Sequence, residues 1–171
     1  IYALFIASQF VNATKGNVLI VSAETLSKVA SEKFYYITGD GGAAALLSYT
    51  KNKSKGIHAY YLDSDGSYSD KMGVPGNLPP VADSSSKQKY LFQTHGNISN
   101  IIEAQWKKIP KTLYKLSGLR SDKIKALIPH QVNKKMIELA QKSAKVKREI
   151  LVDKVGEYGN CGQVSMLIAL H

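Results

Sequence analysis

Short, wholly apolar runs alternate with helical periodicities along most of this 171-residue chain. Residues 18–21 (Val-Leu-Ile-Val) form an uninterrupted apolar run, which is typical of a strand buried on both faces. Turn chemistry and composition predict further strands at residues 43–49, 57–62, 124–128 and 150–152. Helices are predicted at residues 1–13, 98–118, 131–144 and 160–170. This alternation indicates an α/β fold with buried sheets.

Three stretches add detail to this pattern. Residues 1–13 are apolar almost all round, which predicts a buried core helix; the run has no initiator Met or basic leader and is too short to span a membrane. Pro110 should kink or break the helix that Asn97 or Ser99 would cap. Residues 64–90 are rich in Gly, Pro, Ser and Asp, so we expect a surface excursion between two halves, 1–85 and 86–171.

The net charge of +10 comes mostly from lysine, since the only arginines are Arg120 and Arg148. The lysines are denser in residues 107–115 and 134–148, which fits either solvated helix faces or a surface for an acidic protein partner. Nucleic-acid binding has no support beyond charge. The single Cys161 excludes an internal disulfide and no Cys/His cluster suggests zinc, so we expect a reducing, cytoplasmic compartment.

Two polar residues lie where predicted strands end and helices begin. His130 follows the strand at 124–128, and Asn160 follows the strand at 150–152 and a glycine loop. Neighbouring strands would bring these side chains together at one edge of a sheet, where α/β proteins commonly place functional groups. Two neutral hydrogen-bond donors suit an enolate or a thioester oxygen on which negative charge develops. Each residue also has a structural interpretation, as a packed histidine and as a helix N-cap.

These motifs together resemble the β-ketoacyl-[acyl carrier protein] synthase III family of the thiolase superfamily. Residues 129–133 (Pro-His-Gln-Val-Asn), followed by Gly159-Asn160, are similar to the signature of that family. Residues 38–47 resemble its Gly-Asp-Gly strand, and residues 56–68 resemble the strand that ends in Asp-Gly-Ser. Residues 1–12 resemble the helix after its nucleophilic cysteine. The resemblance covers essentially the whole chain.

The resemblance implies a layered αβαβα fold in which this chain supplies the end of the first half and the start of the second. It implies an acyltransferase of fatty acid biosynthesis that condenses an acyl group with malonyl-[acyl carrier protein] and releases carbon dioxide. A cysteine thiolate would first take the acyl group from acyl-CoA. His130 and Asn160 would then donate hydrogen bonds to the malonyl thioester oxygen. No cofactor or metal is implied.

The same resemblance locates further groups. The nucleophilic cysteine would fall just before Ile1 and is absent from this chain, as is a glycine-rich loop near the C-terminus. Cys161 is predicted to be a packed structural thiol rather than a substitute nucleophile. Asn133 would lie near the pantetheine tunnel or cap the following helix, and Lys134 and Lys135 would dock the acidic carrier protein or remain solvated. The resemblance also implies a homodimer.

Some residues depart from the family pattern. Thr38 replaces the usual Phe, and Cys161 and Gln163 replace small or hydroxylic residues after Asn160. The loop around Glu32 and Lys33 lacks an arginine that commonly contacts the CoA phosphate. These differences leave two alternatives open: a specialised ketosynthase of secondary metabolism, and a non-catalytic partner subunit with the same fold. We also expect that the chain does not fold stably alone, because its first helix would expose apolar faces.

Overall fold

The computed structural model describes residues 1–74, 92–93 and 98–171. Its strands are β1 (Val18–Thr25), β2 (Asp40–Leu47), β3 (Met72–Gly73) and β4 (Phe92–Gln93). Its α-helices are α1 (Tyr2–Thr14), α2 (Glu32–Tyr35), α3 (Ile98–Ser117), α4 (Lys134–Ala144), α5 (Val155–Tyr158) and α6 (Ser165–Leu170). Single 3₁₀ turns occur at Leu26–Lys28, Gly66–Tyr68, Ser121–Lys123, Arg148–Ile150 and Gly162–Val164. The predicted boundary between residues 85 and 86 lies outside the described residues, as does Asn97.

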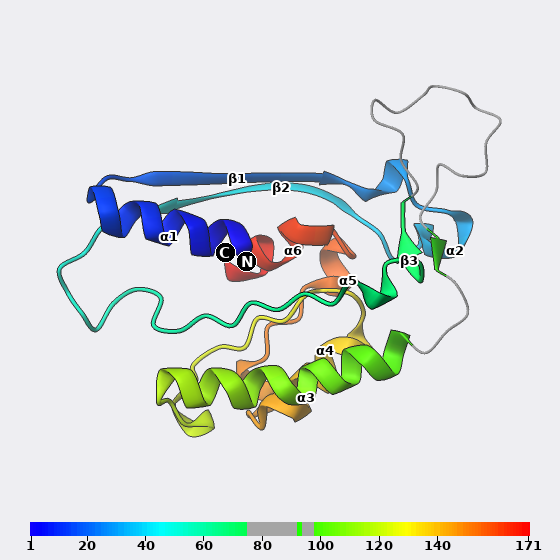
Figure 1. Cartoon of the computed structure of the whole chain (residues 1–171). Coiled ribbons are helices and arrows are strands. Elements are labelled where there is room, and N and C mark those ends of the chain that lie inside the picture. The colour runs from blue at the N-terminus through cyan, green and yellow to red at the C-terminus, as the bar shows by residue number, and fades with distance from the viewer. Residues whose placement is uncertain (75–91, 94–97) are drawn as a thin grey trace.

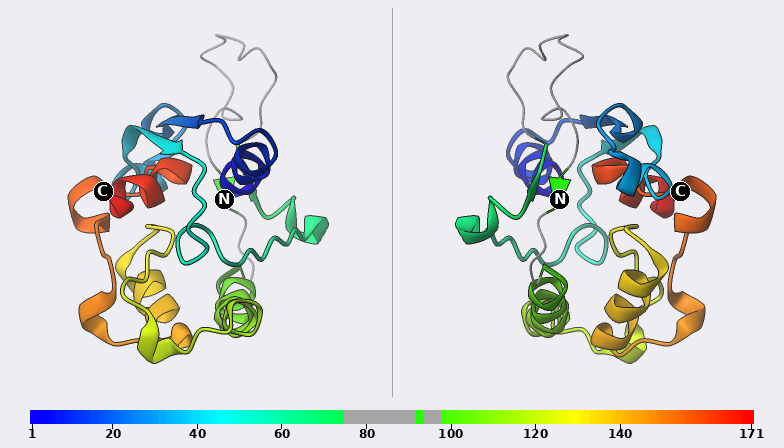
Figure 2. Two further views of the ribbon diagram at one scale, coloured as in Figure 1. Left: turned by 90° about the vertical axis from the view of Figure 1, so that its left-hand side faces the viewer. Right: turned by 90° about the vertical axis from the view of Figure 1, so that its right-hand side faces the viewer.

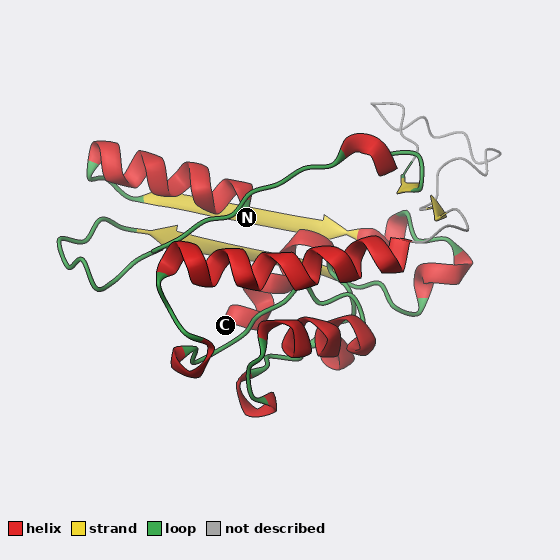
Figure 3. Cartoon of the chain, turned by 60° about the horizontal axis from the view of Figure 1, so that its bottom comes forward, coloured by secondary structure: helices red, strands yellow, loops and turns green. Residues whose placement is uncertain are grey.

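The described elements form layers. β1 and β2 pair antiparallel over their full length, from Val18 opposite Leu47 to Thr25 opposite Asp40. The helices α1 and α6 lie beneath one face of this pair, and α3 and α4 form a separate layer farther from it (Figures 1 and 2). The chain between these layers is mostly loop, as Figure 3 shows. A mixed α/β architecture is therefore confirmed.

The covered face of the β1–β2 pair carries the packing that fixes α1 and α6. Ala7 and Val11 of α1 are buried, and so are Val164 and Ala169 at the C-terminal end. The backbone of β2 approaches α6 so closely that a Cβ added at Gly41 would lie 3.0 Å from Ile168 Cδ1. Small residues on β2 thus allow the last helix to pack directly against the strand.

The other face of the pair is exposed in this chain, so the prediction that residues 18–21 are buried on both faces is wrong here. Burial alternates along β1, and Leu19 and Val21 are 62% and 69% exposed. Leu46, opposite Leu19 in the register, is 65% exposed. The prediction that the first helix would expose apolar side chains is confirmed, because Tyr2, Ile6 and Phe10 of α1 are exposed.

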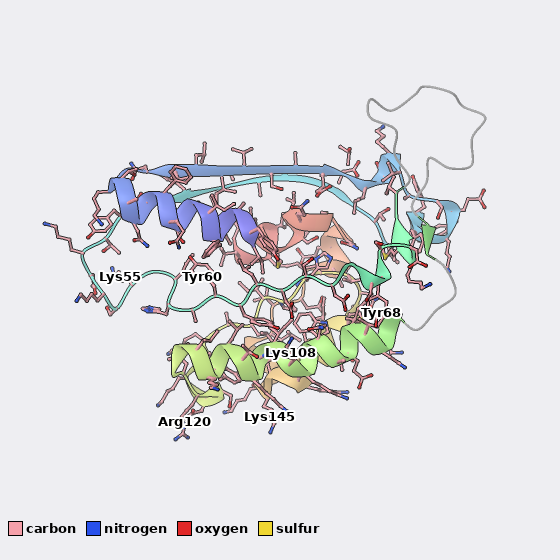
Figure 4. The ribbon with its side chains drawn as sticks, in the orientation of Figure 1. Lys55, Tyr60, Tyr68, Lys108, Arg120 and Lys145 are labelled. Atoms are coloured by element: carbon pink, nitrogen blue, oxygen red, sulfur yellow. The ribbon has the colours of Figure 1, made fainter. Side chains whose placement is uncertain are left out.

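Three predicted strands are absent or reduced. Residues 57–62 have no strand assignment, because no described segment pairs with their backbone in a ladder. The segment instead passes beside α1, where Tyr60 packs edge-on against Phe5, and ends at Asp63, which accepts a 2.9 Å hydrogen bond from Lys108 of α3 (Figure 4). The strands predicted at 124–128 and 150–152 meet only at one parallel bridge, Leu127 with Leu151.

Helix boundaries differ from the predictions in α3, in α4 and in α6, which begins at Ser165 after a 3₁₀ turn rather than at residue 160. α3 runs through Pro110 without a break, and Pro110 is buried. Packing on α4 outweighs the lost backbone hydrogen bond: Tyr114 of α3 donates a 2.7 Å bond to the carbonyl of Ala144. The predicted end at Gly118 is confirmed by its left-handed φ of 69°. α4 begins at Lys134 rather than residue 131.

None of the helices in the described part of the chain is both long and apolar enough to cross a membrane.

Candidate active site

His130 lies just beyond the bridge between two segments that run in the same direction. The amide of Leu127 donates to the carbonyl of Ile150 at 2.8 Å, and the amide of Val152 donates to the carbonyl of Leu127 at 3.0 Å. Because the bridge is parallel, both segments leave it at the same end. His130 follows on one segment and Asn160 on the other, so both residues lie beyond the same end of the bridge.

The environment of His130 favours a neutral imidazole. Its side chain is half-buried, and this burial lowers its pKa below the usual histidine value. Within the described residues, no side chain or backbone group hydrogen-bonds to the imidazole. A neutral ring can donate from one nitrogen to a bound ligand, and the sequence predicts this donor role for His130.

Asn160 is held by backbone groups from the opposite end of the chain. Its backbone amide donates to the carbonyl of Ile37 at 2.7 Å, and its backbone carbonyl accepts from the amide of Gly39 at 2.9 Å. Its side-chain Oδ1 accepts a 3.0 Å hydrogen bond from the amide of Gly162. The acceptor of the side chain is therefore occupied, and the Nδ2 group has no partner within the described residues, so it can donate to a ligand.

The last helix begins after Asn160 with a turn that needs a glycine. Gly162 adopts a left-handed φ of 56°, and the helical assignment starts there as a 3₁₀ turn before α6. A Cβ at this position would also lie 3.1–3.3 Å from the carboxyl group of Glu24 on β1. The predicted capping role of Asn160 is thus realised through one bond to Gly162 rather than through a regular helix N-cap.

Cys161 is a packed thiol, as predicted. It is fully buried, and burial raises its pKa, which disfavours the nucleophilic thiolate. Its amide donates to Ser165 Oγ at 2.9 Å, and its Sγ lies 3.2 Å from the carbonyl oxygen of Tyr158. Cys161 and Tyr158 both lie close to Gly39. A Cβ added at Gly39 would lie 2.0 Å from the backbone oxygen of Tyr158 and 2.9 Å from Cys161 Sγ.

The predicted carrier-docking residues lie at the start of α4. Asn133 caps this helix, since its Oδ1 accepts a 2.9 Å hydrogen bond from the amide of Met136, which realises the structural interpretation of that residue. Lys134 and Lys135 are exposed in the first turn. The first turn has no acidic residue, and lysines there oppose the helix macrodipole, so helix stability does not account for them. Arg120 and Lys145 extend the basic character along the outer side of the α3–α4 layer (Figure 4).

Sequence reasoning missed the groups that hold Asn160. Ile37, Gly39 and Gly162 carry no functional side chain, and their roles depend on backbone positions and close approach. The glycines were the only signal available in the sequence. Gly39 stands where no Cβ fits, and Gly162 stands where the backbone is left-handed. In the ranges 1–74, 92–93 and 98–171 no group of three or more His, Cys, Asp or Glu side chains could hold a metal ion.

Two separate parts of the chain match descriptions of one enzyme family. Residues 1–66 match "3-Oxoacyl-[acyl-carrier-protein (ACP)] synthase III", and residues 115–171 match the C-terminal part of the same synthase. The chain belongs to the 3-oxoacyl-[acyl-carrier-protein] synthase III family. The second match contains both His130 and Asn160 and includes the segments joined by the Leu127 bridge.

Individual members of the synthase III family agree with this assignment. The β-ketoacyl-[acyl-carrier-protein] synthase III of Sulfurovum sp. is 30% identical over 180 residues, which cover 100% of this chain and 53% of the relative. The enzyme of the same name from Caldanaerobacter subterraneus is 32% identical over 178 residues, covering 99% of this chain and 54% of the relative. The chain therefore spans about half the length of the curated relatives it matches.

Solved structures of synthase III enzymes share the fold. A crystal structure of a 3-oxoacyl-(acyl-carrier-protein) synthase III matches with a TM-score of 0.88 at 20% identity, over 99% of this chain and 55% of that one. The β-ketoacyl synthase III of Thermus thermophilus matches with a TM-score of 0.86 at 26% identity, over 99% of this chain and 54% of that one. These matches confirm the predicted thiolase-like fold.

Proposed function

We propose that the full-length gene product containing these residues is an acyltransferase of the synthase III type. It joins an acyl thioester to malonyl-[acyl carrier protein]. The observation that carries the proposal is the pair of neutral donors: the half-buried His130 imidazole and the Asn160 amide, whose oxygen is already occupied by Gly162. The family of the chain supports this reaction. Because the chain spans about half the length of its relatives, the remaining active-site groups of the proposed enzyme would come from residues outside it.

The donors act on the malonyl thioester. Loss of carbon dioxide breaks the bond between the malonyl carboxyl carbon and C2, and its electron pair forms an enolate. His130 and Asn160 donate hydrogen bonds to the thioester oxygen that carries the developing charge. The enolate C2 then attacks the acyl carbonyl carbon, forming the new carbon–carbon bond. The cysteine predicted before Ile1 would carry that acyl group and leave as a thiolate.

The acyl carrier protein and acyl-CoA are the proposed partners, because relatives of this name act in carrier-protein chemistry. Lys134 and Lys135 form an exposed cationic end of α4 that suits an acidic carrier surface. Asn133 caps the helix that presents both lysines. We also propose a homodimer, which light scattering on the purified protein would test. The departures at Thr38 and Gln163 leave the identity of the acyl group to be measured.

The test is carbon dioxide release from malonyl-[acyl carrier protein] by the full-length gene product and its variants. His130→Ala and Asn160→Ala should each lower kcat by about 100-fold, because each removes one donor to the developing oxyanion. His58→Ala and Asn100→Ala, at exposed positions, are the matched controls. Unchanged turnover in both site variants would exclude the proposed mechanism. Wild-type protein without turnover but with normal folding would favour the partner-subunit alternative.

A further inference from the structure

Gln131 is a buried amide that joins the two segments leading to the proposed donors. It follows His130 directly and is only 1% exposed. Its Nε2 donates to the carbonyl of Pro129 at 2.8 Å and to the carbonyl of Val152 at 3.3 Å. Its Oε1 accepts from the amide of Lys154 at 2.8 Å. One side chain therefore ties the His130 loop to the chain that continues toward Asn160.

The three groups around this side chain match an amide and little else. Two backbone carbonyls require donors, and one backbone N–H requires an acceptor. A glutamine supplies both from one planar group, whereas an ionised glutamate has no donor and a methionine has neither. Leaving buried backbone groups unpaired is costly, so the site selects strongly for glutamine. This selection is independent of any contact with solvent or substrate.

The link bears directly on the placement of His130. Within the described residues nothing hydrogen-bonds to its imidazole, so the ring takes its position from the backbone and from packing. That backbone is fixed on both sides by the bonds of Gln131, since the side chain binds the carbonyl before His130. A further bond joins the amide of Val132 to the carbonyl of His130 at 3.1 Å. Loss of the amide would leave the loop without its tie to Val152 and Lys154.

We propose that Gln131 is a positioning residue that sets the location of the His130 imidazole relative to the segment carrying Asn160. This role rests on the proposed function for its catalytic consequence, but its structural consequence can be measured separately. Misplacement of a reacting group by about 1 Å can cost about 100-fold in rate. The expected signature is a fall in kcat with a small change in KM, because the substrate contacts themselves remain.

The experiment compares Gln131→Met with Gln131→Glu in the full-length gene product. Methionine keeps the length of the side chain and removes all three hydrogen bonds, so kcat for malonyl-[acyl carrier protein] should fall by about 10-fold or more. The ¹H–¹⁵N signals of the His130 ring should shift as well. Gln141→Met is the matched control, since Gln141 also donates to a carbonyl, that of Val146, but at the far end of α4. It should leave kcat and the His130 signals unchanged.

Gln131→Glu adds a pH-dependent readout. A buried carboxylate would face two carbonyl oxygens, so burial should raise its pKa and the protein should be destabilised at neutral pH. Protonation restores one donor while the other oxygen still accepts from Lys154. The midpoint of thermal unfolding relative to wild type should therefore recover as pH falls, together with the wild-type His130 signals measured against wild type at the same pH. A merely space-filling residue would show no such recovery.

The outcomes separate the two proposals. Wild-type protein that releases no carbon dioxide removes the proposed function, while shifted His130 signals in Gln131→Met would still uphold the positioning role. A folded Gln131→Met variant with unchanged kcat and unchanged His130 signals overturns that role. If this variant does not fold, Gln131→Glu at low pH decides: recovery of folding without recovery of the His130 signals also overturns it.

Discussion

The two proposed donors are held by different parts of the molecule. Asn160 is fixed by the backbone of Ile37 and Gly39, which belong to the opposite end of the chain, and by the nearby Gly162. His130 is fixed within the C-terminal part, by the Leu127 bridge and the Gln131 bonds. One donor therefore depends on contacts with the N-terminal part of the chain, and the other on contacts within the C-terminal part. A mutation that disrupts the contact between residues 37–39 and Asn160 should displace Asn160 and leave His130 in place.

The largest expected effect comes from Gly39→Ala. The added Cβ would meet the Tyr158 oxygen at 2.0 Å, so the contact that holds Asn160 must open. We expect a loss of about 3 kcal/mol in the free energy of unfolding, as for a severe overpacking change. Urea unfolding of the full-length gene product would measure it. Gly66→Ala is the control, because apart from its chain neighbours no described residue has an atom within 4 Å of a Cβ added there. Equal stabilities would show that residues 37–39 do not hold Asn160 tightly.

Gly162→Ala should lower the free energy of unfolding by less than Gly39→Ala, and it also disturbs the contacts that hold Asn160. Alanine at a φ of 56° costs about 1–2 kcal/mol, and its Cβ would also press on the Glu24 carboxyl at 3.1 Å. Gly118→Ala shares the left-handed backbone but has open space, so it isolates the conformational part. Chemical denaturation of both variants gives the difference. If Gly162→Ala lowers the free energy of unfolding no more than Gly118→Ala does, the Glu24 side chain moves away from the added Cβ without loss of stability.

Asn133→Ala tests the framework on the His130 side. It removes the cap of α4 and should cost about 1 kcal/mol in the free energy of unfolding. Asn133→Asp keeps an acceptor for the Met136 amide and should retain most of the stability. Because α4 carries Lys134 and Lys135, carrier-protein affinity should fall only if the first turn frays. Surface plasmon resonance with the carrier protein would show this, and an unchanged unfolding midpoint would contradict the capping role.

The smallest effect concerns the pH dependence contributed by His130. Burial lowers its pKa in the folded protein, so between the folded and unfolded pKa values the unfolded chain binds more protons. Its contribution is fully present above the unfolded pKa of about 6.5 and is lost as pH falls through the folded pKa. His130→Gln should reduce the loss of stability on acidification, as pH profiles of the free energy of unfolding would show. Parallel pH profiles for wild type and His130→Gln would contradict this assignment.

Several features could be predicted from the sequence because they depend on local patterns. The apolar run at 18–21 predicted β1, and the periodicity around Ile101 and Trp106 predicted α3 up to Gly118. The motifs around His130 and Asn160 predicted the family, which the two matching segments confirm. Cys161 was correctly predicted to be a packed thiol. The roles of His130 and Asn160 in catalysis stay predictions until turnover is measured.

Other features depended on partners that no local pattern specifies. Residues 57–62 have strand composition but no ladder partner in the described chain, so they remain loop. Pro110 lies inside an unbroken helix because packing against α4 offsets one lost hydrogen bond. Residues 131–133 were predicted to be helical, yet Gln131 turns inward and Asn133 becomes the cap.

The sequence alone determined the fold class, the family and the types of group at the site, because strand and helix periodicity and short motifs are written in neighbouring residues. Only the tertiary structure decided what holds those groups in place. The bonds from Ile37 and Gly39 to Asn160, and from Gln131 to Val152 and Lys154, join segments far apart in sequence. The partners of Asn160 and Gln131 in these bonds are backbone atoms, which every residue carries, so the partners leave almost no signal in composition or spacing.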